Sequence, residues 1–376
     1  MLEVFETDLL ELEQQGRLRA LRGRAGADFT SNDYLGMAES DELKRAAEAA
    51  IARGVPVGSG GSRLLRGNHP EHEALETEAA AYFGAETALY FGGGYVANLA
   101  IFSTLPQRGD LVIHDELIHA SVHEGLRRGR ADFVRVSHNN VDAFDAAIVR
   151  WRANGGTGRP WISVESLYSM DGDGPDLAAL LAVADRHEAM LVIDEAHATG
   201  VLGPQGRGLA AGFEGRENVI TLHTCGKALG TAGGLVLGPR TIRDFLVNRA
   251  RPFIFATAPS PLIAAITRAA LEISRTNPER REQLARLVGF AGHELRRRCG
   301  IEASGTHIVP VIIGSDQAAV NVAACLQRRG FDIRAIRPPT VPEGTARLRI
   351  AFTTAVDETT ISDLFAALAE DMRAAA

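Results

Sequence analysis

The sequence predicts an α/β fold, in which helices cover both faces of a mostly parallel central sheet. Seven short apolar runs of four or five residues recur between residues 87 and 237, and segments of helix length separate them. Strands that are buried on both faces are apolar throughout, so runs of this kind indicate a parallel sheet. After residue 270 the pattern changes to a long helix rich in Arg and Glu, followed by further strand-like runs, which is typical of a smaller α+β unit.

The order of the elements sets the expected domain organisation. Residues 1–25 carry leucines at helical spacing among charged residues, which predicts an amphipathic helix laid against the body of the protein. We therefore expect an N-terminal segment (1–40), a large domain (41–270) and a small C-terminal α+β domain (271–376). The strand-like runs, in order, are 87–91, 110–113, 133–136, 161–164, 190–193, 219–222 and 234–237 in the large domain, and 308–313 and 346–352 in the small one.

Composition excludes several classes of protein. The 40 basic and 47 acidic residues are interspersed and give a net charge of −7, so no basic face favours nucleic acid as a partner. Three widely spaced cysteines with no CxxC pair indicate a reduced, cytoplasmic chain. The first residues are acidic, and no apolar run reaches the ~18 residues that a membrane span requires. We expect a protein that is soluble and cytoplasmic.

A lysine and an aspartate form the most informative pair of candidate site residues. Lys227 lies in a loop of small residues, about thirty residues after an apolar run that ends at Asp194. A lysine amine can form a Schiff base with pyridoxal phosphate, while a carboxylate at the pyridine nitrogen keeps the ring protonated. Burying Asp194 would be costly unless a cation pairs with it, and a pyridinium supplies that cation. The structural alternatives are a solvated lysine and a helix-capping aspartate.

Other candidates also follow strand-like runs, which is where open α/β sheets bind ligands. The segment Gly92-Gly-Gly-Tyr95 comes between a strand-like run and a helical segment, so its backbone N–H groups could bind a phosphate. An ordinary strand-to-helix turn is the alternative. His119 could lie flat on a pyridine ring or be a plain core or surface histidine, and His197 could reach the phenolic oxygen of the cofactor.

Competing motifs are incomplete. Gly58–Arg63 lacks the last glycine of a dinucleotide fingerprint, and the loop around Lys227 lacks the glycine and the Ser/Thr of a nucleotide-binding P-loop. Asp171–Pro175 begins like a calcium loop but places proline where a ligand belongs. His119 and His123 lie four residues apart without the HExxH pattern or an evident third ligand. The sequence therefore predicts no metal site.

Taken together, these segments resemble the α-oxoamine synthases, which are fold-type-I pyridoxal phosphate enzymes that join an amino acid to an acyl thioester with loss of carbon dioxide. The resemblance extends over nearly the whole chain. It implies the fold-type-I transferase fold and a homodimer whose active site lies between two subunits. The motifs that carry it are Ser31-Asn-Asp-Tyr-Leu-Gly36, Gly58-Ser-Gly-Gly-Ser-Arg63, His119-Ala-Ser121, Ser169-Met-Asp-Gly-Asp173, Asp194-Glu-Ala-His-Ala-Thr-Gly200, Gly206-Arg-Gly208 and Thr224-Cys-Gly-Lys227.

The resemblance also implies roles for residues at the matching positions. Lys227 would hold the cofactor and later move the proton of the amino acid Cα, while Asp194 would pair with the pyridine nitrogen. His119 would stack on the ring, and His197 would donate a hydrogen bond to its oxygen. The further cofactor contacts would be Ser169, Thr224, the backbone of Gly94 and Tyr95 and, across the subunit interface, Thr257.

Substrate binding is expected to involve residues near both ends of the chain. The resemblance implies Asn32, Thr340, Arg347 and Arg349. Arg349 would bind the amino-acid carboxylate in the bidentate manner that a guanidinium allows. Arg347 is a close alternative, because strand alternation places it on the same face as Arg349.

A C-terminal stretch narrows the resemblance. Ala335-Ile-Arg-Pro-Pro-Thr-Val-Pro342, followed by Gly344-Thr-Ala-Arg-Leu-Arg349, resembles one branch of the family, which condenses L-alanine with a pimeloyl thioester in biotin biosynthesis. The thioester could be carried by coenzyme A or by an acyl carrier protein. Arginines 17, 19, 22 and 24 offer a patch for an acidic carrier or simply a solvated helix face.

Several alternatives stay open on the sequence alone. The chain could be another α-oxoamine synthase that accepts glycine or serine and a different acyl-CoA. It could also be an ordinary aminotransferase or a non-catalytic subunit of the same fold, although such a subunit need not keep Lys227, Asp194 and His119 together. Whether His223 and Cys225 touch the cofactor is also open.

Overall fold

The computed structural model describes residues 1–375. The contacts between residues divide the chain into two compact units. The large unit comprises Leu35–Tyr168 and Gly174–Arg281, and the small unit comprises Met1–Tyr34, Ser169–Asp173 and Glu282–Ala376. The N-terminal residues therefore belong to the same unit as the C-terminal segment.

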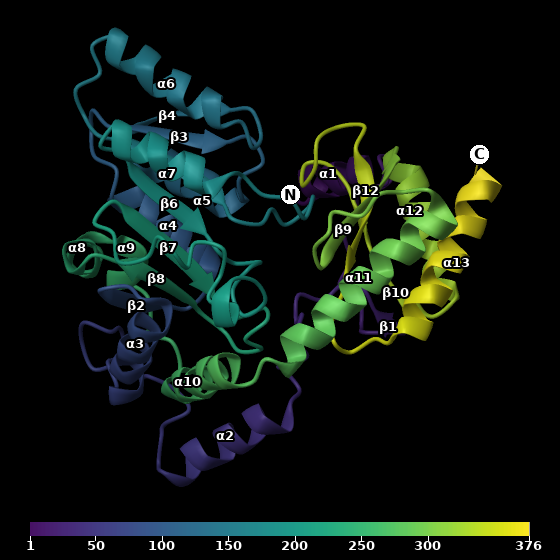
Figure 1. The fold of residues 1–376 in the computed structure, drawn as a ribbon, viewed down its shortest axis with the longest axis horizontal. Coiled ribbons are helices and arrows are strands. Elements are labelled where there is room, and N and C mark those ends of the chain that lie inside the picture. Colours follow the sequence, from purple (N-terminus) through teal and green to yellow (C-terminus); the bar gives the residue numbers. More distant parts are fainter. Residues whose placement is uncertain (376) are drawn as a thin grey trace. The chain divides into compact units, whose positions relative to one another are not determined.

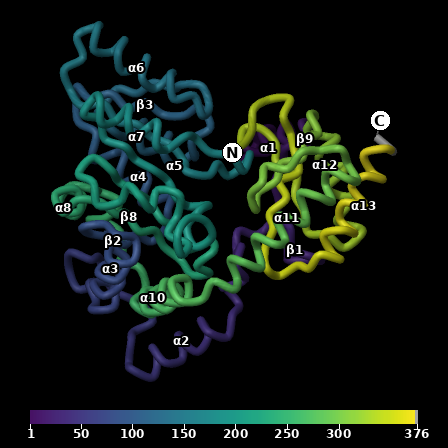
Figure 2. Tube along the Cα trace, viewed as in Figure 1, coloured from purple at the N-terminus to yellow at the C-terminus, as the bar shows by residue number. Residues whose placement is uncertain are grey.

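The large unit is built on a seven-stranded sheet with the strand order β2-β8-β7-β6-β5-β3-β4 (Figure 1; Figure 2 shows the chain trace). The strands that pair β7-β6-β5-β3-β4 are parallel, as predicted, whereas β8 runs antiparallel to both of its neighbours. Each predicted apolar run is confirmed as a strand. Their bounds are β2 (Thr87–Phe91), β3 (Leu111–Asp115), β4 (Asp132–Val136), β5 (Pro160–Glu165), β6 (Met190–Asp194), β7 (Val219–Thr224) and β8 (Gly234–Gly238).

Helices cover both faces of this sheet. One apolar cluster joins α4, α5, α8 and α9 to side chains such as Val112 and Val192, and the second joins α6 and α7 to Ile113 and Ile193. Alternate residues of one strand thus enter opposite cores, which explains why the strands are apolar throughout. The helices are α2 (Asp41–Ala52), α3 (Pro70–Phe83), α4 (Gly94–Thr104), α5 (Ala120–Arg128), α6 (Val141–Ala153), α7 (Leu177–Arg186), α8 (Arg240–Arg249), α9 (Arg251–Ile254) and α10 (Pro261–Thr276), with a 3₁₀ turn at Pro204–Gly206.

The small unit contains an antiparallel sheet with the order β11-β12-β9 and a short parallel pair, β1 with β10 (Figure 1). This agrees with the α+β pattern expected after residue 270. Its elements are α1 (Glu3–Gln14), β1 (Ala27–Asp28), most of α11 (Glu279–Cys299), β9 (Ile308–Gly314), α12 (Asp316–Arg328), β10 (Phe331–Asp332), β11 (Ala335–Ile336), β12 (Ala346–Ala351) and α13 (Glu358–Ala375).

Helix starts follow local signals in the sequence. The hydroxyl groups of Ser40, Ser260 and Ser315 each accept a hydrogen bond from the third backbone N–H of the helix that follows. Proline occupies a first-turn position in α3 and α10, where the missing N–H is not needed. No helix among residues 1–375 is long and apolar enough to cross a membrane.

One expectation about the fold is wrong. The N-terminal amphipathic segment does form a helix, but α1 ends at Gln14 and none of its residues is buried. Of the four leucines that predicted packing against the body, Leu9, Leu18 and Leu21 are exposed and only Leu12 is partly buried, so this leucine face is not packed on the body. The helical period of the leucines predicts that the helix has an apolar face, but it does not predict which surface that face packs against.

Candidate active site

The large unit gathers most of the predicted cofactor residues around one cavity. Parallel strands end at the same edge of a sheet, so the residues that follow β2, β3, β6 and β7 meet there. The cavity has a volume of about 140 Å³. It is lined by Gly94, Tyr95, Asn98, His119, Ser121, Glu165, Asp194, Ala196, His197, Thr224 and Lys227.

Lys227 lies in a closed loop directly after β7. The backbone bonds Cys225 N to Gly233 O (2.9 Å) and Gly230 N to Lys227 O (2.8 Å) close this loop. Its half-buried amine Nζ lies 2.7 Å from Nε2 of the buried His197. The chain contains only two lysines, and the other, Lys44, is exposed on α2 beside Asp41. Lys227 is therefore the one lysine that the large unit directs into a cavity.

Asp194 is a buried carboxylate at the end of β6, with 7% of its surface exposed. Oδ2 accepts a hydrogen bond from the Asn98 amide (2.7 Å) and Oδ1 accepts one from the Ala196 backbone (2.9 Å). Among residues 1–375, no arginine or lysine forms an ion pair with it. A buried carboxylate that faces a cavity with neutral donors alone suits a cationic ligand, and the pyridinium of pyridoxal phosphate is such a ligand.

Asn98 and Ser121 connect Asp194 to His119, and the sequence reasoning missed both as site residues. Asn98 donates to Asp194 and also to Ser121 Oγ (3.0 Å), which lies 2.7 Å from His119 Nδ1. The Ser121 backbone N–H points at the same nitrogen (3.3 Å), so Nδ1 is the acceptor. Burial lowers the pKa of His119 despite the opposing effect of Asp194, which favours a neutral imidazole. Asn98 lies one helical turn after Gly94, and that spacing was the available signal.

The start of α4 faces the same cavity without a side-chain cap. Its cap residue, Gly93, has no side chain to satisfy the first backbone N–H groups. Gly92 and Gly93 leave open space, and a Cβ at Gly94 would meet Thr224 Oγ1 at 3.5 Å. Free N–H groups at a helix start, together with the helix dipole and a hydroxyl, are the features that bind a phosphate. The cavity thus offers groups that fit the amine-reactive, ring and phosphate portions of pyridoxal phosphate.

In the small unit, Arg349 lies together with Asn32 and Ser169. Arg349 Nη2 donates to Asn32 Oδ1 (2.9 Å) and to Tyr34 Oη (3.2 Å), and Nε donates to Ser169 O (2.5 Å). Burial raises the pKa of Tyr34 to about 12, so its hydroxyl is neutral. Tyr34 is a further residue that the sequence reasoning missed, although it lies within the Ser31–Gly36 motif. None of the residues 1–375 supplies a carboxylate to Arg349.

Arg347 is in a different situation on the same strand, β12. Its guanidinium forms an ion pair with Asp171 (2.5 Å) and also donates to the backbone and the hydroxyl of Thr345. Both arginines are buried, but Arg347 already has an anionic partner. The arginine that retains a donor for an incoming carboxylate is therefore Arg349.

The structure does not place two predicted residues at either cluster. Thr340 is exposed, and its hydroxyl lies 3.5 Å from Arg19 Nη2. Thr257 is exposed on the segment after α9 and does not line the cavity. A role for Thr257 consequently requires contact with another subunit.

His223 and Cys225 do not line the cavity either. Strand alternation turns His223 to the opposite face from Thr224, where its ring packs on Phe83 and Nδ1 lies 2.9 Å from Thr199 Oγ1. Burial lowers the pKa of His223 to about 4 and raises that of the Cys225 thiol to about 12. Thr199 also donates to Glu195 O (2.7 Å), so His223 supports the turn that carries His197.

Comparison with known proteins identifies the family. The model of the aminotransferase class I and II family matches residues 25–368. 8-Amino-7-oxononanoate synthase from Anaeromyxobacter dehalogenans is 43% identical over 358 residues, which cover 94% of this chain and 88% of the relative. The same enzyme from Chromobacterium violaceum is 42% identical, with 93% and 94% of the two chains covered.

Solved structures agree with this assignment. Serine palmitoyltransferase from Sphingomonas wittichii has a TM-score of 0.90 at 28% identity, with 100% of this chain and 98% of that chain covered. 8-Amino-7-oxononanoate synthase from Francisella tularensis has a TM-score of 0.79 at 25% identity, with 93% and 98% covered. A serine palmitoyltransferase with a TM-score of 0.89 was solved with pyridoxal phosphate. The chain has the fold-type-I architecture and belongs to the aminotransferase class I and II family of pyridoxal phosphate enzymes and, within it, to the 8-amino-7-oxononanoate synthases.

Proposed function

We propose that this chain condenses L-alanine with a pimeloyl thioester and releases carbon dioxide, a free thiol and 8-amino-7-oxononanoate, a step of biotin biosynthesis. The observation that carries the proposal is the cavity where the Lys227 amine, the Asp194 carboxylate and the His119 imidazole meet. The names of the relatives at 42–43% identity support the choice of substrates. When bound, pyridoxal phosphate supplies an electron sink for the negative charge that forms at the alanine Cα.

Lys227 performs two tasks in this proposal. Its amine would hold the cofactor at the aldehyde, and the same amine, once free, would remove the proton from the alanine Cα. His197 Nε2, at 2.7 Å from Nζ, holds the amine at the cavity wall. The hydrogen bonds that close the loop from Cys225 to Gly233 limit the positions that Nζ can take, so the base is oriented before substrate arrives.

Asp194 and His119 would position the ring of the cofactor. Asp194 would hold the pyridine nitrogen in its protonated form, and the Asn98 and Ala196 donors fix the orientation of its carboxylate. His119, which is neutral and linked through Ser121 to Asn98, would cover the ring and exclude water from it. Gly94, Tyr95 and Thr224 would bind the phosphate at the start of α4. Ser169 would add a further contact to the cofactor.

Arg349 binds the alanine carboxylate, and the two arginines of β12 provide a direct test. We expect Arg349→Ala to raise the KM for L-alanine by about 10- to 100-fold, since a charge-assisted bidentate contact is lost. Arg349→Lys should restore only part of this, because an ammonium lacks the planar fork. The matched variant Arg347→Ala loses the bond to Asp171 and should leave the KM for L-alanine within a few-fold of wild type, whatever its effect on stability.

Steady-state kinetics with L-alanine varied at saturating thioester measures this difference, and thermal unfolding of each variant serves as the folding control. A larger rise in the KM for L-alanine in Arg347→Ala than in Arg349→Ala would assign the carboxylate to Arg347. The side chain of Asn32 is neutral. In this proposal Asn32 orients Arg349, because its Oδ1 accepts a hydrogen bond from Arg349 Nη2 (2.9 Å).

We also propose that the enzyme is a homodimer that works in the cytoplasm. Thr257 is exposed and lies outside the cavity of its own subunit, which supports a role in which it reaches the phosphate of a second subunit. The cysteines Cys225, Cys299 and Cys325 are free, in agreement with a reducing compartment.

A panel of substrates tests the proposed reaction. The purified enzyme, loaded with pyridoxal phosphate, is given L-alanine, glycine or L-serine with pimeloyl-CoA, a pimeloyl carrier protein, succinyl-CoA or palmitoyl-CoA. Carbon dioxide release and thiol release are measured. We expect kcat/KM for L-alanine with a pimeloyl thioester to exceed that of the other pairs by at least about tenfold, the discrimination that one methyl or hydroxyl group allows. Preference for glycine or serine would contradict the proposal and leave the family assignment intact.

A further inference from the structure

The N-terminal helix α1 exposes an apolar stripe, of which only Leu12 is partly buried. Leu2, Phe5, Leu9 and Leu12 recur at helical spacing, and 67% of Phe5 and 51% of Leu9 is exposed. A twelve-residue helix is marginal in water unless tertiary packing supports it. The exposed stripe therefore indicates a surface that another part of the assembled protein covers.

The same helix carries a strong negative charge. Its twelve residues include five carboxylates and no lysine or arginine. At helical spacing Glu6, Asp8 and Glu13 flank the apolar stripe, whereas Glu3 and Glu11 lie farther round the helix. A partner surface for α1 must therefore combine apolar area with positive charge.

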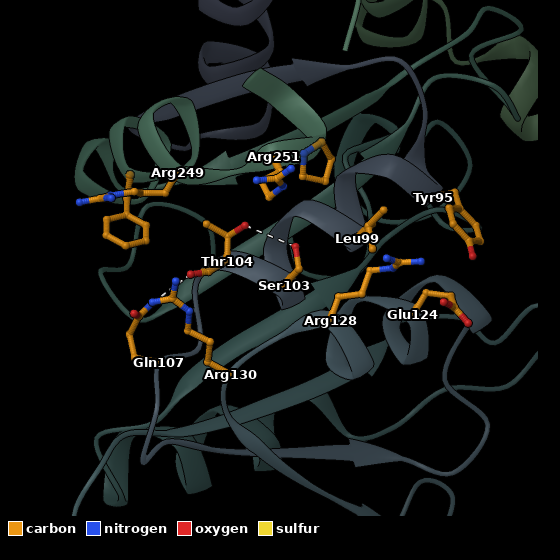
Figure 3. Close-up of a pocket in the computed structure, with 12 residues that line it drawn as sticks. Tyr95, Leu99, Ser103, Thr104, Gln107, Glu124, Arg128, Arg130, Arg249 and Arg251 are labelled. Atoms are coloured by element: carbon orange, nitrogen blue, oxygen red, sulfur yellow. Dashed lines mark hydrogen bonds between the residues drawn. The ribbon is translucent and has the colours of Figure 1, made fainter. Parts of the chain in front are cut away.

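The large unit contains a surface of this kind, which we call the arginine groove. It is a cavity of about 1000 Å³ between α4, α5, α8 and α9 (Figure 3). Apolar and aromatic side chains form part of its wall, among them Leu99 and the exposed rings of Tyr95 and Phe245. Its remaining lining residues are Ser103, Thr104, Gln107, Glu124, Arg128, Arg130, Arg249, Arg251 and Pro252.

The charge of the groove is complementary to that of α1. Four arginines line it, and the single carboxylate, Glu124, already pairs with Arg127 outside the lining (2.8 Å). No carboxylate among residues 1–375 forms an ion pair with Arg128, Arg130 or Arg249, and Arg251 lies over the ring of Phe255. Guanidinium groups gathered without anions repel one another, so an acidic partner is favoured.

We propose that α1 of a second copy of this chain docks in the arginine groove, with its apolar stripe on Tyr95, Leu99 and Phe245 and its carboxylates on the arginines. This inference rests on the proposed homodimer. Arg251 and Pro252 line the groove and come a few residues before Thr257 in the sequence. In the proposed dimer Thr257 contacts the second subunit, so the groove adjoins the proposed dimer interface. Docking in trans also covers the wall of the groove at Tyr95, a residue that the cofactor cavity shares.

Reversal of charge on each side tests the contact. Glu6→Arg/Glu13→Arg in α1 and Arg128→Glu/Arg249→Glu in the groove should each raise the dimer dissociation constant of the holoenzyme by at least about tenfold. Because the two reversed surfaces are again complementary, the quadruple variant should recover most of the wild-type value. Sedimentation velocity over a concentration series measures the dissociation constant. Arg150→Glu, on the exposed face of α6, is the matched control and should leave it unchanged.

Cross-linking separates docking in trans from docking within one chain. Leu9→Cys and Phe245→Cys are made in separate proteins, in a background with Cys299 and Cys325 replaced by serine, and are mixed under oxidising conditions. A disulfide-linked dimer that needs both proteins supports docking in trans. A disulfide within one chain, formed only when both cysteines are in the same molecule, would overturn the proposal.

The outcomes also distinguish this inference from the proposed function. A wild type that is dimeric and condenses alanine, but whose dimer ignores both charge reversals, contradicts the α1 contact and leaves the reaction intact. A wild type that is monomeric and active contradicts both the contact and the proposed dimer. Circular dichroism verifies that each variant is folded, and recovery in the quadruple variant excludes a general loss of structure as the cause.

Discussion

Lys227→Ala is expected to lower the rate of condensation by about 10⁴-fold or more, the largest loss that any single substitution in this chain should cause. Proton transfer by a positioned base contributes about 10²- to 10⁴-fold, and the covalent hold on the cofactor is lost as well. The 2.7 Å contact between Nζ and His197 disappears with the amine. Carbon dioxide release measures the rate, and the visible absorbance of the loaded protein reports the covalent attachment.

The composition of the chain makes this test unusually clean. Lys44 and Lys227 are its only lysines, so borohydride reduction of the C=N bond followed by peptide mass analysis has two possible outcomes. Label on Lys227 supports the proposal, and Lys44→Ala is the matched control, expected to keep full activity because Lys44 is exposed. Label on Lys44, or full turnover by Lys227→Ala, would contradict the assignment.

Asp194→Asn is expected to lower kcat by about 10²- to 10³-fold, the usual effect of removing a charge that is organised to stabilise a transition state. The substitution keeps the size of the side chain and removes the negative charge that, in the proposed function, would hold the pyridine nitrogen protonated. It should also weaken binding of the cofactor, which titration of the apoprotein followed by absorbance measures. Asn98→Ala removes one hydrogen bond to the carboxylate (2.7 Å) but leaves the charge, so we expect about a tenfold loss.

The two variants separate the charge of Asp194 from its orientation. A loss in Asn98→Ala as large as that in Asp194→Asn would mean that orientation, and not charge, is what Asp194 contributes. If Asp194→Asn were fully active, the carboxylate would not be the partner of the ring, and the other buried acid that lines the cavity, Glu165, would be the next candidate.

Most of the sheet could be predicted from the sequence, because its strands are buried on both faces. Such strands are apolar along their whole length, as Met190–Asp194 and Val219–Thr224 are, and the signal is local. The antiparallel direction of β8 could not be predicted in this way. A buried strand has the same composition in either direction, and its pairing with β2 and β7 is decided by loops and by neighbours distant in sequence.

The residues of the candidate site also fall into those that could be predicted from the sequence and those that could not. Lys227, Asp194 and His119 were predicted because each follows a strand-like run and has side-chain chemistry that a pyridoxal phosphate enzyme needs. Asn98 was missed, since its contact with Asp194 joins residues 96 positions apart. Arg347 and Arg349 share one face of one strand, and their partners distinguish them: Asp171 pairs with Arg347, whereas Arg349 binds neutral groups such as Asn32.

By itself, the sequence determined the elements that local patterns encode. These are the buried strands, the helical period of α1, the glycine-rich start of α4 and the pairing of a lysine loop with an aspartate at the end of a strand. The tertiary structure decided which groups are neighbours: the donors on Asp194, the anion already bound to Arg347, and the absence of any buried residue in α1. The physical reason is that periodicity and composition record how each residue prefers to be solvated, whereas hydrogen bonds and ion pairs depend on distances that exist only after distant segments have packed together.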